Sequence, residues 1–344
     1  MRIVSLVPSA TETLFALGLG DQLVAVTHEC DFPPETKSLP VVTRSTMPLH
    51  TQNSGAIELA VARAASSGRS LYEIDTAAIR ALSPDLVIAQ DVCRVCAVSA
   101  DEVAQDLAGI PMIRQHPHSL EDVLGDMEEL AAACDADSSD LMASLRARIS
   151  SAARAARTLP PIRGVFLEWL DPPYRAGHWT PDLLELANIR DAIGRPGIPS
   201  IAGSWSEVAA ARPELLILAP CGFGLERALA ETELVRAEID AVGAKKVVVL
   251  DGSAYFNRPG PRLVDSIEAL VESRREMAGT CVECGTELDQ ADYAVCHICV
   301  EGAYCIGCAS KHLCRPDCAE RGCIAGLCTK RVRRGALSGT FGMK

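Results

Sequence analysis

Short apolar runs alternate with helix-like patterns over the first 116 residues. Runs such as "RIVSLV" and "LVIAQ" are mostly apolar, which is typical of strands that are buried on both faces of a sheet. Between them, apolar residues recur every three or four positions, which predicts amphipathic helices. We expect strands at residues 2–7, 23–26, 86–90 and 112–116, and helices at 10–17 and from 76 to the residue before Pro84. Strands and helices that alternate in this way build parallel β/α units.

The next forty residues carry no strand pattern. Residues 119–134 and 138–159 predict two amphipathic helices, of which the second is rich in Ala and Arg and ends before Pro160 and Pro161. A long helical segment between two α/β blocks indicates a connector.

Strand and helix patterns resume in a second α/β block. We expect strands at 164–169, 215–220 and 247–252, and helices at 180–187, 204–211, 225–239 and 260–277. The expected fold class is therefore α/β, with two Rossmann-like lobes joined by a long backbone helix and followed by a small Cys-rich module. The expected boundaries are 1–118 for the N-terminal lobe, 119–160 for the helical connector, 161–276 for the C-terminal lobe, 279–330 for the Cys-rich module and 331–344 for a basic flexible tail.

Composition and charge narrow the possible partners. The chain has 344 residues, 48% of them apolar, and a net charge of −12, which argues against nucleic acid or an anionic membrane as its main partner. No stretch approaches eighteen apolar residues, so no membrane span is expected. The first residues lead directly into a strand, without the charge, apolar core and cleavage site of a signal peptide. We therefore expect a cytoplasmic protein.

The chain's few aromatic residues, 4% of the total, gather in loops that follow predicted strands. The segment "EWLDPPYRAGHW" at 168–179 holds two of the three tryptophans. Ligands of open parallel sheets bind beyond the carboxyl ends of the strands, so we expect these loops to face a cleft. The residues are Trp169, Trp179, Trp205, Phe223, Tyr255 and Phe256 in the second block, and His28, Phe32, Cys93, Cys96, His116 and His118 in the first. Aromatic walls suit a large, flat, partly apolar ligand.

Each of these residues also has a plainer interpretation. Trp169 at a strand end is a candidate for the core, and His178 is a candidate for a hydrogen bond to a loop carbonyl. Cys221 can pack as a small buried apolar residue. A lone CxxC at 93–96 is as consistent with packing as with metal or redox chemistry. The shared placement of the residues, more than any one of them, predicts the cleft.

Several motifs resemble the vitamin B12-binding proteins of the class III, or helical-backbone metal receptor, periplasmic-binding-protein superfamily. The motifs are "RIVSLVPSATETLFALGLGDQLVAVTHECDFPPE", "LSPDLVIAQDVCRVCAVS", "FLEWLDPPYRAGHW", "LAPCGFGLER" and "DGSAYFNRPGPRLVDSIEAL", and the resemblance covers about residues 1–272. It implies two α/β lobes joined by one long helix. It also implies a non-enzymatic protein that binds a corrinoid, haem, iron–siderophore or metal ion between the lobes.

The resemblance implies a set of candidate ligand-binding residues. They are Pro8, Ser9, Glu12, Asp31, Phe32, Asp91, Cys93 and Cys96 in the first block, and Glu168, Trp169, His178, Trp179, Trp205, Cys221, Phe223, Tyr255 and Asn257 in the second. His28 and His116 join the set because they follow predicted strands. We expect the aromatic side chains to pack against a macrocycle and a cleft histidine to approach the cobalt ion of a corrinoid.

Ten of the fifteen cysteines lie between residues 281 and 328. Dense CxxC spacing in a reducing compartment indicates metal rather than disulfides. A CxxC turn presents two thiolates to one Zn²⁺ ion, and a short segment without an apolar core needs such an ion to fold. The expected ligands of about two structural Zn²⁺ ions are Cys281, Cys284, Cys296, Cys299, Cys305, Cys308, His312, Cys314, Cys318, Cys323 and Cys328.

The pairing of these ligands stays open, and so does their chemistry. A cross-braced arrangement pairs Cys281 and Cys284 with Cys305 and Cys308, and Cys296 and Cys299 either with His312 and Cys314 or with Cys314 and Cys318. Disulfides, a redox-active cluster or an iron–sulfur cluster are alternatives. Closed four-ligand sites are structural, so we expect the module to bind a protein partner or to stabilise the tail.

The sequence supports three functions in order. The first is the capture of a corrinoid or a related metal chelate in the cleft, in the cytoplasm. The second is a metal-ion or thiol-metabolite sensor in which Cys30, Cys93, Cys96 and Cys221 bind the metal and the tail signals to a partner. An enzyme comes third, because no nucleophile–base pair, phosphate-binding loop or acid–base dyad is evident.

Overall fold

A computed structural model of the chain describes residues 1–47, 52–67, 70–92 and 100–277, together with residues 293–296, 303–305 and 329–332. By its contacts the chain divides into two compact units. The first comprises Met1–Ala147, Gly164–Leu183 and Asp191–Ser266, and the second comprises Arg148–Arg163, Leu184–Arg190 and Ile267–Lys344. Both predicted lobes contribute to the first unit. The domain boundaries expected from the sequence stay a prediction.

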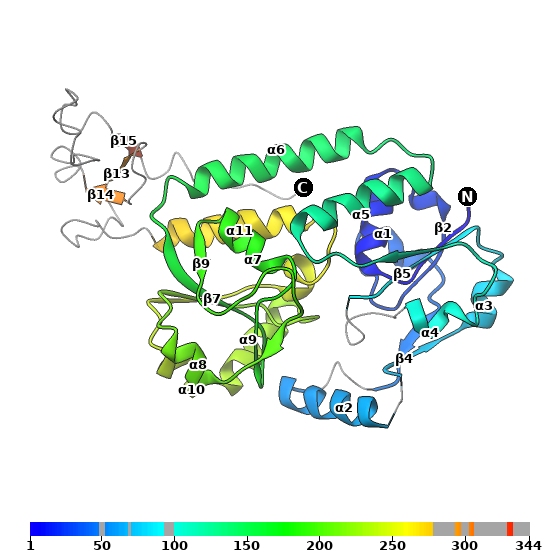
Figure 1. The fold of residues 1–344 in the computed structure, drawn as a ribbon, viewed down its shortest axis with the longest axis horizontal. Helices are drawn as coiled ribbons and strands as arrows, with labels where there is room; N and C mark the ends of the chain where they lie inside the picture. The colour runs from blue at the N-terminus through cyan, green and yellow to red at the C-terminus, as the bar shows by residue number, and fades with distance from the viewer. Residues whose placement is uncertain are drawn as a thin grey trace. The chain divides into compact units, whose positions relative to one another are not determined.

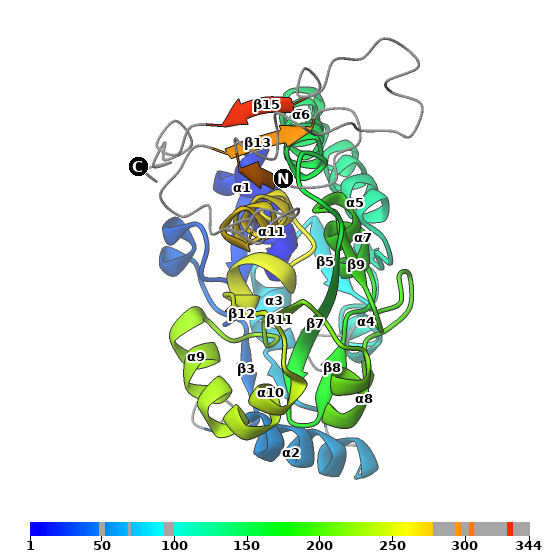
Figure 2. The ribbon, with the colours of Figure 1, turned by 90° about the vertical axis from the view of Figure 1, so that its left-hand side faces the viewer.

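The N-terminal lobe is built on a four-stranded parallel sheet (Figures 1 and 2). Its order is β2-β1-β5-β6, with β1 at Ile3–Ser5, β2 at Leu23–Val26, β5 at Leu86–Gln90 and β6 at Met112–Gln115. Helices α1 (Pro8–Ala16) and α5 (Leu120–Ala133) cover one face, and α3 (Thr76–Ala81) and α4 (Ala100–Ala104) cover the other. A sheet covered on both faces explains why β1 and β5 read as continuous apolar runs.

Smaller elements complete this lobe. They are the antiparallel pair β3 (Thr43–Ser45) and β4 (Tyr72–Ile74), the helix α2 (Ser54–Ser66) and the 3₁₀ turns η1 (Gly20–Gln22) and η2 (Pro34–Ser38). None of these is evident in the apolar pattern of the sequence, because the strands are short and pair away from the main sheet.

The C-terminal lobe contains a mixed sheet in the order β10-β8-β7-β11-β12. Strands β7 (Ile162–Leu170), β11 (Leu215–Leu218) and β12 (Lys246–Val249) are parallel, and β8 (Pro173–Arg175) and β10 (Ile201–Ala202) are antiparallel at the edge. The remaining elements are α7 (Thr180–Leu186), β9 (Ile189–Asp191), α8 (Trp205–Ala210), α9 (Leu225–Leu234), α10 (Arg236–Val242), the π-helical turn η4 (Gly252–Phe256) and α11 (Leu263–Met277). The chain therefore has the two-lobed α/β fold that the sequence predicts.

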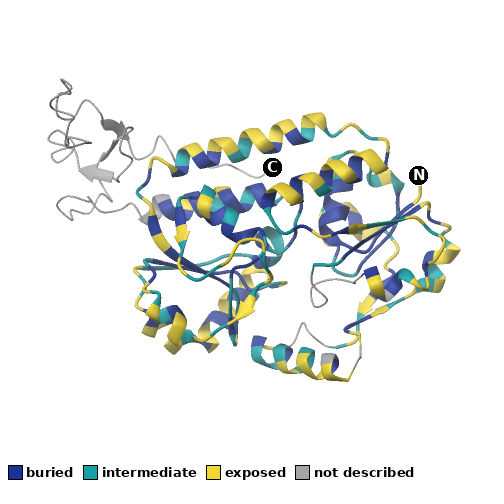
Figure 3. Cartoon of the chain, in the orientation of Figure 1, coloured by how far each residue is buried: buried dark blue, intermediate teal, exposed yellow. Residues whose placement is uncertain are grey.

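The two helices expected between the lobes are present as α5 and α6 (Ser139–Ala156). Ser119 begins α5 with a capping box: its hydroxyl accepts the N–H of Asp122, and the Asp122 carboxylate accepts the N–H of Ser119 at 2.9 Å. The buried residues of α5 follow the helical period and lie on one side of the helix (Figure 3). Local sequence therefore determines both the start and the buried face of this helix.

One predicted helix is divided in the structure. The segment 225–239 forms α9 and α10, which meet at Val235. The side chain of Val235 is buried in a cluster with Leu216 and Leu218 of β11, so packing on the sheet overrides the continuous helical pattern. Within the described part of the chain, no helix is long and apolar enough to cross a membrane.

Two short strands lie within the predicted Cys-rich module, and a third crosses its predicted end at residue 330. β13 (Tyr293–Cys296) pairs antiparallel with both β14 (Ala303–Cys305) and β15 (Thr329–Val332), in the order β14-β13-β15.

Candidate ligand-binding cavity

A cavity of about 390 Å³ lies where strands of both lobes end. Its lining comes from the carboxyl ends of β1, β5 and β6 in the first lobe and of β7 and β11 in the second, together with α2 and η4. All lining residues belong to the first compact unit. They include Val7, Pro8, Ser9, Ile57, Gln90, Gln115, Glu168, Trp169, Tyr174, His178, Trp179, Cys221, Phe223, Arg227, Phe256, Asn257 and Arg258. Strand ends of parallel sheets are the expected place for a ligand.

Aromatic rings form the wall that the second lobe contributes. The rings of Trp169 and Phe223 lie 5.1 Å apart between centroids, nearly edge to face. Trp179 is buried, and its Nε1–H donates to the carbonyl of Phe256 at 2.8 Å. Tyr174 donates to Glu58 Oε1 at 2.9 Å. These contacts explain why the chain concentrates its rare rings in residues 168–179.

Helix α2 supplies another wall, although it belongs to the first lobe in sequence. Ile57 packs with Phe223 and Ala228 of the second lobe. The N–H and hydroxyl of Ser54 donate to Glu231 Oε2 of α9 at 3.0 and 2.8 Å. The sequence pattern did not reveal these contacts, because Phe223, Ala228 and Glu231 lie far from α2 along the chain.

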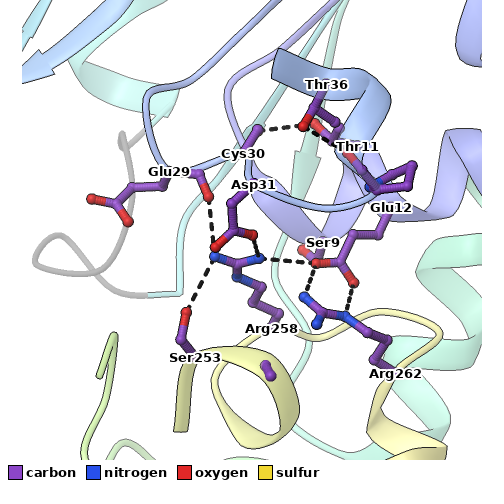
Figure 4. A network of polar contacts seen from close by, with 12 residues as sticks. Ser9, Thr11, Glu12, Glu29, Cys30, Asp31, Thr36, Ser253, Arg258 and Arg262 are labelled. Carbon is purple, nitrogen blue, oxygen red and sulfur yellow. Dashed lines mark hydrogen bonds and ion pairs between the residues drawn. The ribbon is translucent and has the colours of Figure 1, made fainter. Parts of the chain in front are cut away.

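An ion cluster centred on the buried residues Glu12 and Arg258 lies beside the cavity (Figure 4). Glu12 accepts from Arg258 at 3.1 Å and from Arg262 at 2.8 Å, and its side chain is 2% exposed. Arg258 also donates to the carboxylate of Asp31, to the carbonyl of Glu29 and to the hydroxyl of Ser253. Partial burial raises the pKa of Asp31, but the hydrogen bond and charge of Arg258 outweigh it and hold this pKa below its usual value.

Three histidines gather at one side of the cavity. The rings of His116 and His118 lie 4.4 Å apart between centroids, and those of His118 and His178 lie 5.8 Å apart. Of the three, His178 lines the cavity, and it has a left-handed backbone with φ of 47°. Burial, aided by the charges of the other two histidines, lowers the pKa of His178 to about 4, so it is neutral at pH 7.

Glu168 is the carboxyl at the end of β7. Burial raises its pKa to about 7, despite a hydrogen bond of 3.0 Å that the N–H of Gly177 donates to Oε1. At neutral pH the side chain is therefore partly protonated.

The structure separates the predicted ligand-binding residues into two groups. Ser9, Glu168, Trp169, His178, Trp179, Cys221, Phe223 and Asn257 line the cavity. Glu12, His28, Asp31, Phe32, Asp91, His116, Trp205 and Tyr255 do not belong to its lining. Cys93 and Cys96 lie outside the described residues.

The residues of the second group have other contacts. Glu12 and Asp31 belong to the ion cluster. His28 lies 2.7 Å from the Thr43 hydroxyl through Nδ1, and Asp91 lies 3.3 Å from Arg114. The ring of Phe32 lies under the guanidinium of Arg262, and His116 is exposed. Trp205 packs against the sheet of the second lobe, and the carbonyl of Tyr255 accepts a hydrogen bond from Ser266.

The cysteines give little support to a metal sensor. Cys30 is buried in the core of the first lobe, beside the hydroxyl of Thr11 at 3.2 Å, and burial raises the pKa of its thiol to about 11. A thiol with so high a pKa is a poor metal ligand at pH 7, because the thiolate binds the metal.

Most predicted zinc ligands lie outside the described residues. These are Cys281, Cys284, Cys299, Cys308, His312, Cys314, Cys318, Cys323 and Cys328. Cys296 and Cys305 are described in their backbone, at the ends of β13 and β14. Among the residues that the structure describes, no group of three His, Cys, Asp or Glu side chains is placed to hold a metal ion. The zinc module therefore stays a prediction.

Sequence reasoning missed several lining residues. Gln90 and Gln115 are the last residues of β5 and β6, and they pair across the sheet. The feature of the sequence that could have identified them is a polar residue at the end of an apolar strand. Arg227 and Arg258 follow strands at a greater distance, and nothing local indicates that they reach the cavity.

The chain belongs to the periplasmic binding protein family, which it matches over residues 3–254. It is 25% identical over 280 residues to the vitamin B12-binding protein of Vibrio cholerae serotype O1, and the match covers 78% of this chain and 86% of that protein. It is 26% identical to an uncharacterized ABC transporter substrate-binding lipoprotein of Bacillus subtilis, with 79% of each protein covered.

Two solved structures extend the comparison. The periplasmic vitamin B12-binding protein of Vibrio cholerae has a TM-score of 0.58 at 24% identity, covering 80% of this chain and 96% of that one. The apo form of a periplasmic haem-binding protein from Roseiflexus sp. RS-1 has a TM-score of 0.58 at 25% identity, covering 80% and 98%. Membership of a family of binding proteins supports a ligand-binding role and is consistent with a protein that is not an enzyme.

The comparisons overturn one expectation. The cytoplasmic location predicted from the first residues is wrong, because the family and its relatives are periplasmic proteins or a substrate-binding lipoprotein of an ABC transporter.

Proposed function

We propose that this member of the periplasmic binding protein family binds a corrinoid, a cobalamin-like macrocycle, in the cavity at the strand ends. The observation that carries the proposal is the aromatic wall of Trp169, Phe223 and Phe256 in a cavity at the strand ends of both lobes. Flat macrocycles pack against such rings. Relatives named vitamin B12-binding protein, from Vibrio and Photorhabdus, match most of the chain.

Haem is the alternative ligand, since a haem-binding protein is as similar in structure. Aromatic packing alone does not separate the two macrocycles. The charges at the cavity support the corrinoid, because the lining includes three glutamates, Glu29, Glu58 and the partly protonated Glu168, beside Arg227 and Arg258. Haem carries carboxylates, whereas the side chains of a corrinoid end mainly in uncharged amides. The lining therefore favours the corrinoid.

The size of the cavity bears on how such a ligand enters. About 390 Å³ is near the lower end of the range for small-molecule sites. A cavity of this size holds part of a corrinoid, so we expect its walls to move apart when the ligand binds. Helix α2 is held to the second lobe by non-covalent contacts, among them the two hydrogen bonds that Ser54 donates to Glu231.

Titration of the purified protein with cyanocobalamin and, separately, with haemin tests the proposal. We expect cyanocobalamin to release or absorb heat and to quench tryptophan fluorescence, because Trp169 and Trp179 line the cavity. We expect haemin to bind at least about tenfold more weakly, a difference of about 1.4 kcal/mol. Folded protein that shows neither heat nor quenching with cyanocobalamin, or that prefers haemin, would contradict the proposal.

We also propose that residues 279–330 bind about two structural Zn²⁺ ions. The support is the CxxC spacing and the strand register. Tyr293 pairs with Cys305, so Cys296 lies about 10 Å further along β13, three residues away. Ligands of one tetrahedral ion lie much closer together, so Cys296 and Cys305 would bind different ions. Such closed sites leave the module free to contact a protein partner.

Metal analysis combined with thiol counting tests this second proposal. Periplasmic relatives work in an oxidising compartment, where the same cysteines form disulfides readily. Zinc predicts metal that co-purifies, and thiols that react once a chelator has removed it. Thiols that stay unreactive until a reductant is added would instead establish disulfides.

A further inference from the structure

Four residues that line the cavity each carry a buried polar atom without a hydrogen-bond partner among the described residues. The atoms are Ser9 Oγ, Gln115 Oε1, Trp169 Nε1 and His178 Nε2. The residues Ser9 and Gln115 are only 1% and 4% exposed. An unpaired buried polar group costs about 1–3 kcal/mol, so native proteins rarely keep one without a reason. Four such atoms in the lining of one cavity indicate a ligand that completes their hydrogen bonds.

Ser9 and Gln115 come from the same sheet edge of the first lobe. Ser9 is the second residue of α1, just after β1, and Gln115 ends β6, with β5 between the two strands. Gln90 ends β5 and pairs with Gln115. The Gln90 Oε1 already accepts the N–H of Val92 at 2.5 Å, whereas the Gln115 Oε1 accepts nothing from the described residues.

The two side chains offer complementary roles. The hydroxyl of Ser9 can donate a hydrogen bond, and the carbonyl oxygen of Gln115 can only accept one. A ligand group that satisfies both must accept one hydrogen bond and donate another. A primary amide does so, whereas an ionised carboxylate only accepts.

The nearby cations are not available to a carboxylate. Arg258 donates to Glu12, to Asp31 and to the carbonyl of Glu29 (Figure 4). Arg227 donates to the carbonyl of Gln52 at 2.7 Å, and its guanidinium carbon lies 3.6 Å from the ring centroid of Phe223. A ligand carboxylate would lose its water and would compete with Glu12 and Asp31 for Arg258 and with the ring of Phe223 for Arg227.

We propose that Ser9 and Gln115 form a subsite that binds an uncharged primary amide on the periphery of the ligand and discriminates against a carboxylate at that position. The subsite rests on the proposed function, because it requires a macrocycle that carries such groups. Two residues of the first lobe would therefore determine whether an amide or an acid binds at this position of the cavity.

Calorimetric titration with cobalamin, and with the separated isomers in which one propionamide is hydrolysed to propionate, tests the subsite. We expect the wild-type protein to bind at least one isomer about tenfold more weakly than cobalamin, which corresponds to the loss of one or two good hydrogen bonds. Ser9→Ala and Gln115→Leu should each weaken cobalamin binding about tenfold and reduce the difference between that isomer and cobalamin.

Two further variants keep the test sharp. Gln115→Glu preserves the size and an acceptor oxygen, so it should retain cobalamin binding and increase the discrimination against the acid. Ser266→Ala is the matched control for Ser9→Ala: Ser266 is fully buried outside the cavity, and its hydroxyl donates to the carbonyl of Tyr255 at 2.8 Å. It should change no affinity.

The outcomes separate the two proposals. Wild-type protein that binds cobalamin and every isomer equally overturns the subsite and leaves the corrinoid proposal standing. So does a Gln115→Glu protein that discriminates less than the wild type. Protein that binds haemin but no cobalamin overturns both.

Discussion

Two neighbouring regions bury polar groups in opposite ways. In the ion cluster, Glu12 and Asp31 meet Arg258 and Arg262, so opposite charges pair and hydrogen-bond one another. In the cavity, polar atoms such as Ser9 Oγ are as deeply buried but have no partner among the described residues. Both regions take residues from both lobes. The difference indicates that the cluster stabilises the fold, whereas the polar atoms of the cavity are placed to bind a ligand.

The largest expected effect comes from breaking the cluster. Glu12→Gln leaves Arg262 without its buried carboxylate, and the loss of one partner of a buried ion pair costs about 3–5 kcal/mol. We expect this loss in the free energy of unfolding measured in urea. Glu73→Gln is the matched control, because Glu73 forms a similar two-bond pair with Arg44 on the surface. An equal loss in both variants would show that burial of the cluster contributes nothing.

A smaller effect depends on pH and on His178 at the cavity. Its pKa is about 4 in the fold and near 6.5 when exposed, so the unfolded chain takes up the proton first as the pH falls. This residue therefore lowers stability as the pH falls from 6.5 to 4, by at most about 3 kcal/mol. His178→Asn tolerates the left-handed backbone and should remove this contribution. A constant difference between variant and wild type over this pH range would refute the assignment.

Replacing tryptophans separates the cavity from the core by affinity. Trp169→Ala removes a ring from the cavity wall and should weaken cobalamin binding by about 2 kcal/mol, measured by calorimetry. Trp205→Ala removes a ring that packs against the sheet outside the cavity, so it should lower the melting temperature without changing affinity. The same affinity loss in both variants would mean that Trp169 acts through the fold.

The smallest expected effect is that of removing the Cys-rich module. Every residue that lines the cavity precedes residue 260, so a chain that ends after Met277 should keep its affinity for cobalamin unchanged. Calorimetry of the truncated and full chains makes the comparison. Lost binding in a folded truncated protein would show that the module contributes to the cavity.

Much of the fold was predictable because it depends on local patterns. The strands β1, β2, β5 and β11 are apolar runs that burial on both faces requires, and the start of α5 follows from the capping box at Ser119.

The site was predictable in part. The aromatic and histidine residues of 168–179 fall at a strand end, where ligands bind, and Trp169, His178 and Trp179 do line the cavity.

The sequence by itself determined the α/β pattern and the placement of Trp169, His178 and Trp179 at a strand end, because both depend on residues close together along the chain. Only the tertiary structure decided which buried polar residues pair and which stay unpaired. Glu12 contacts Arg258, which lies 246 positions further along the chain. Nothing in the local sequence indicates that Glu12 finds a partner while the hydroxyl of Ser9, three residues earlier, finds none among the described residues. The partner of a buried charge is chosen by how the lobes pack, since an unpaired charge is too costly to keep inside the protein.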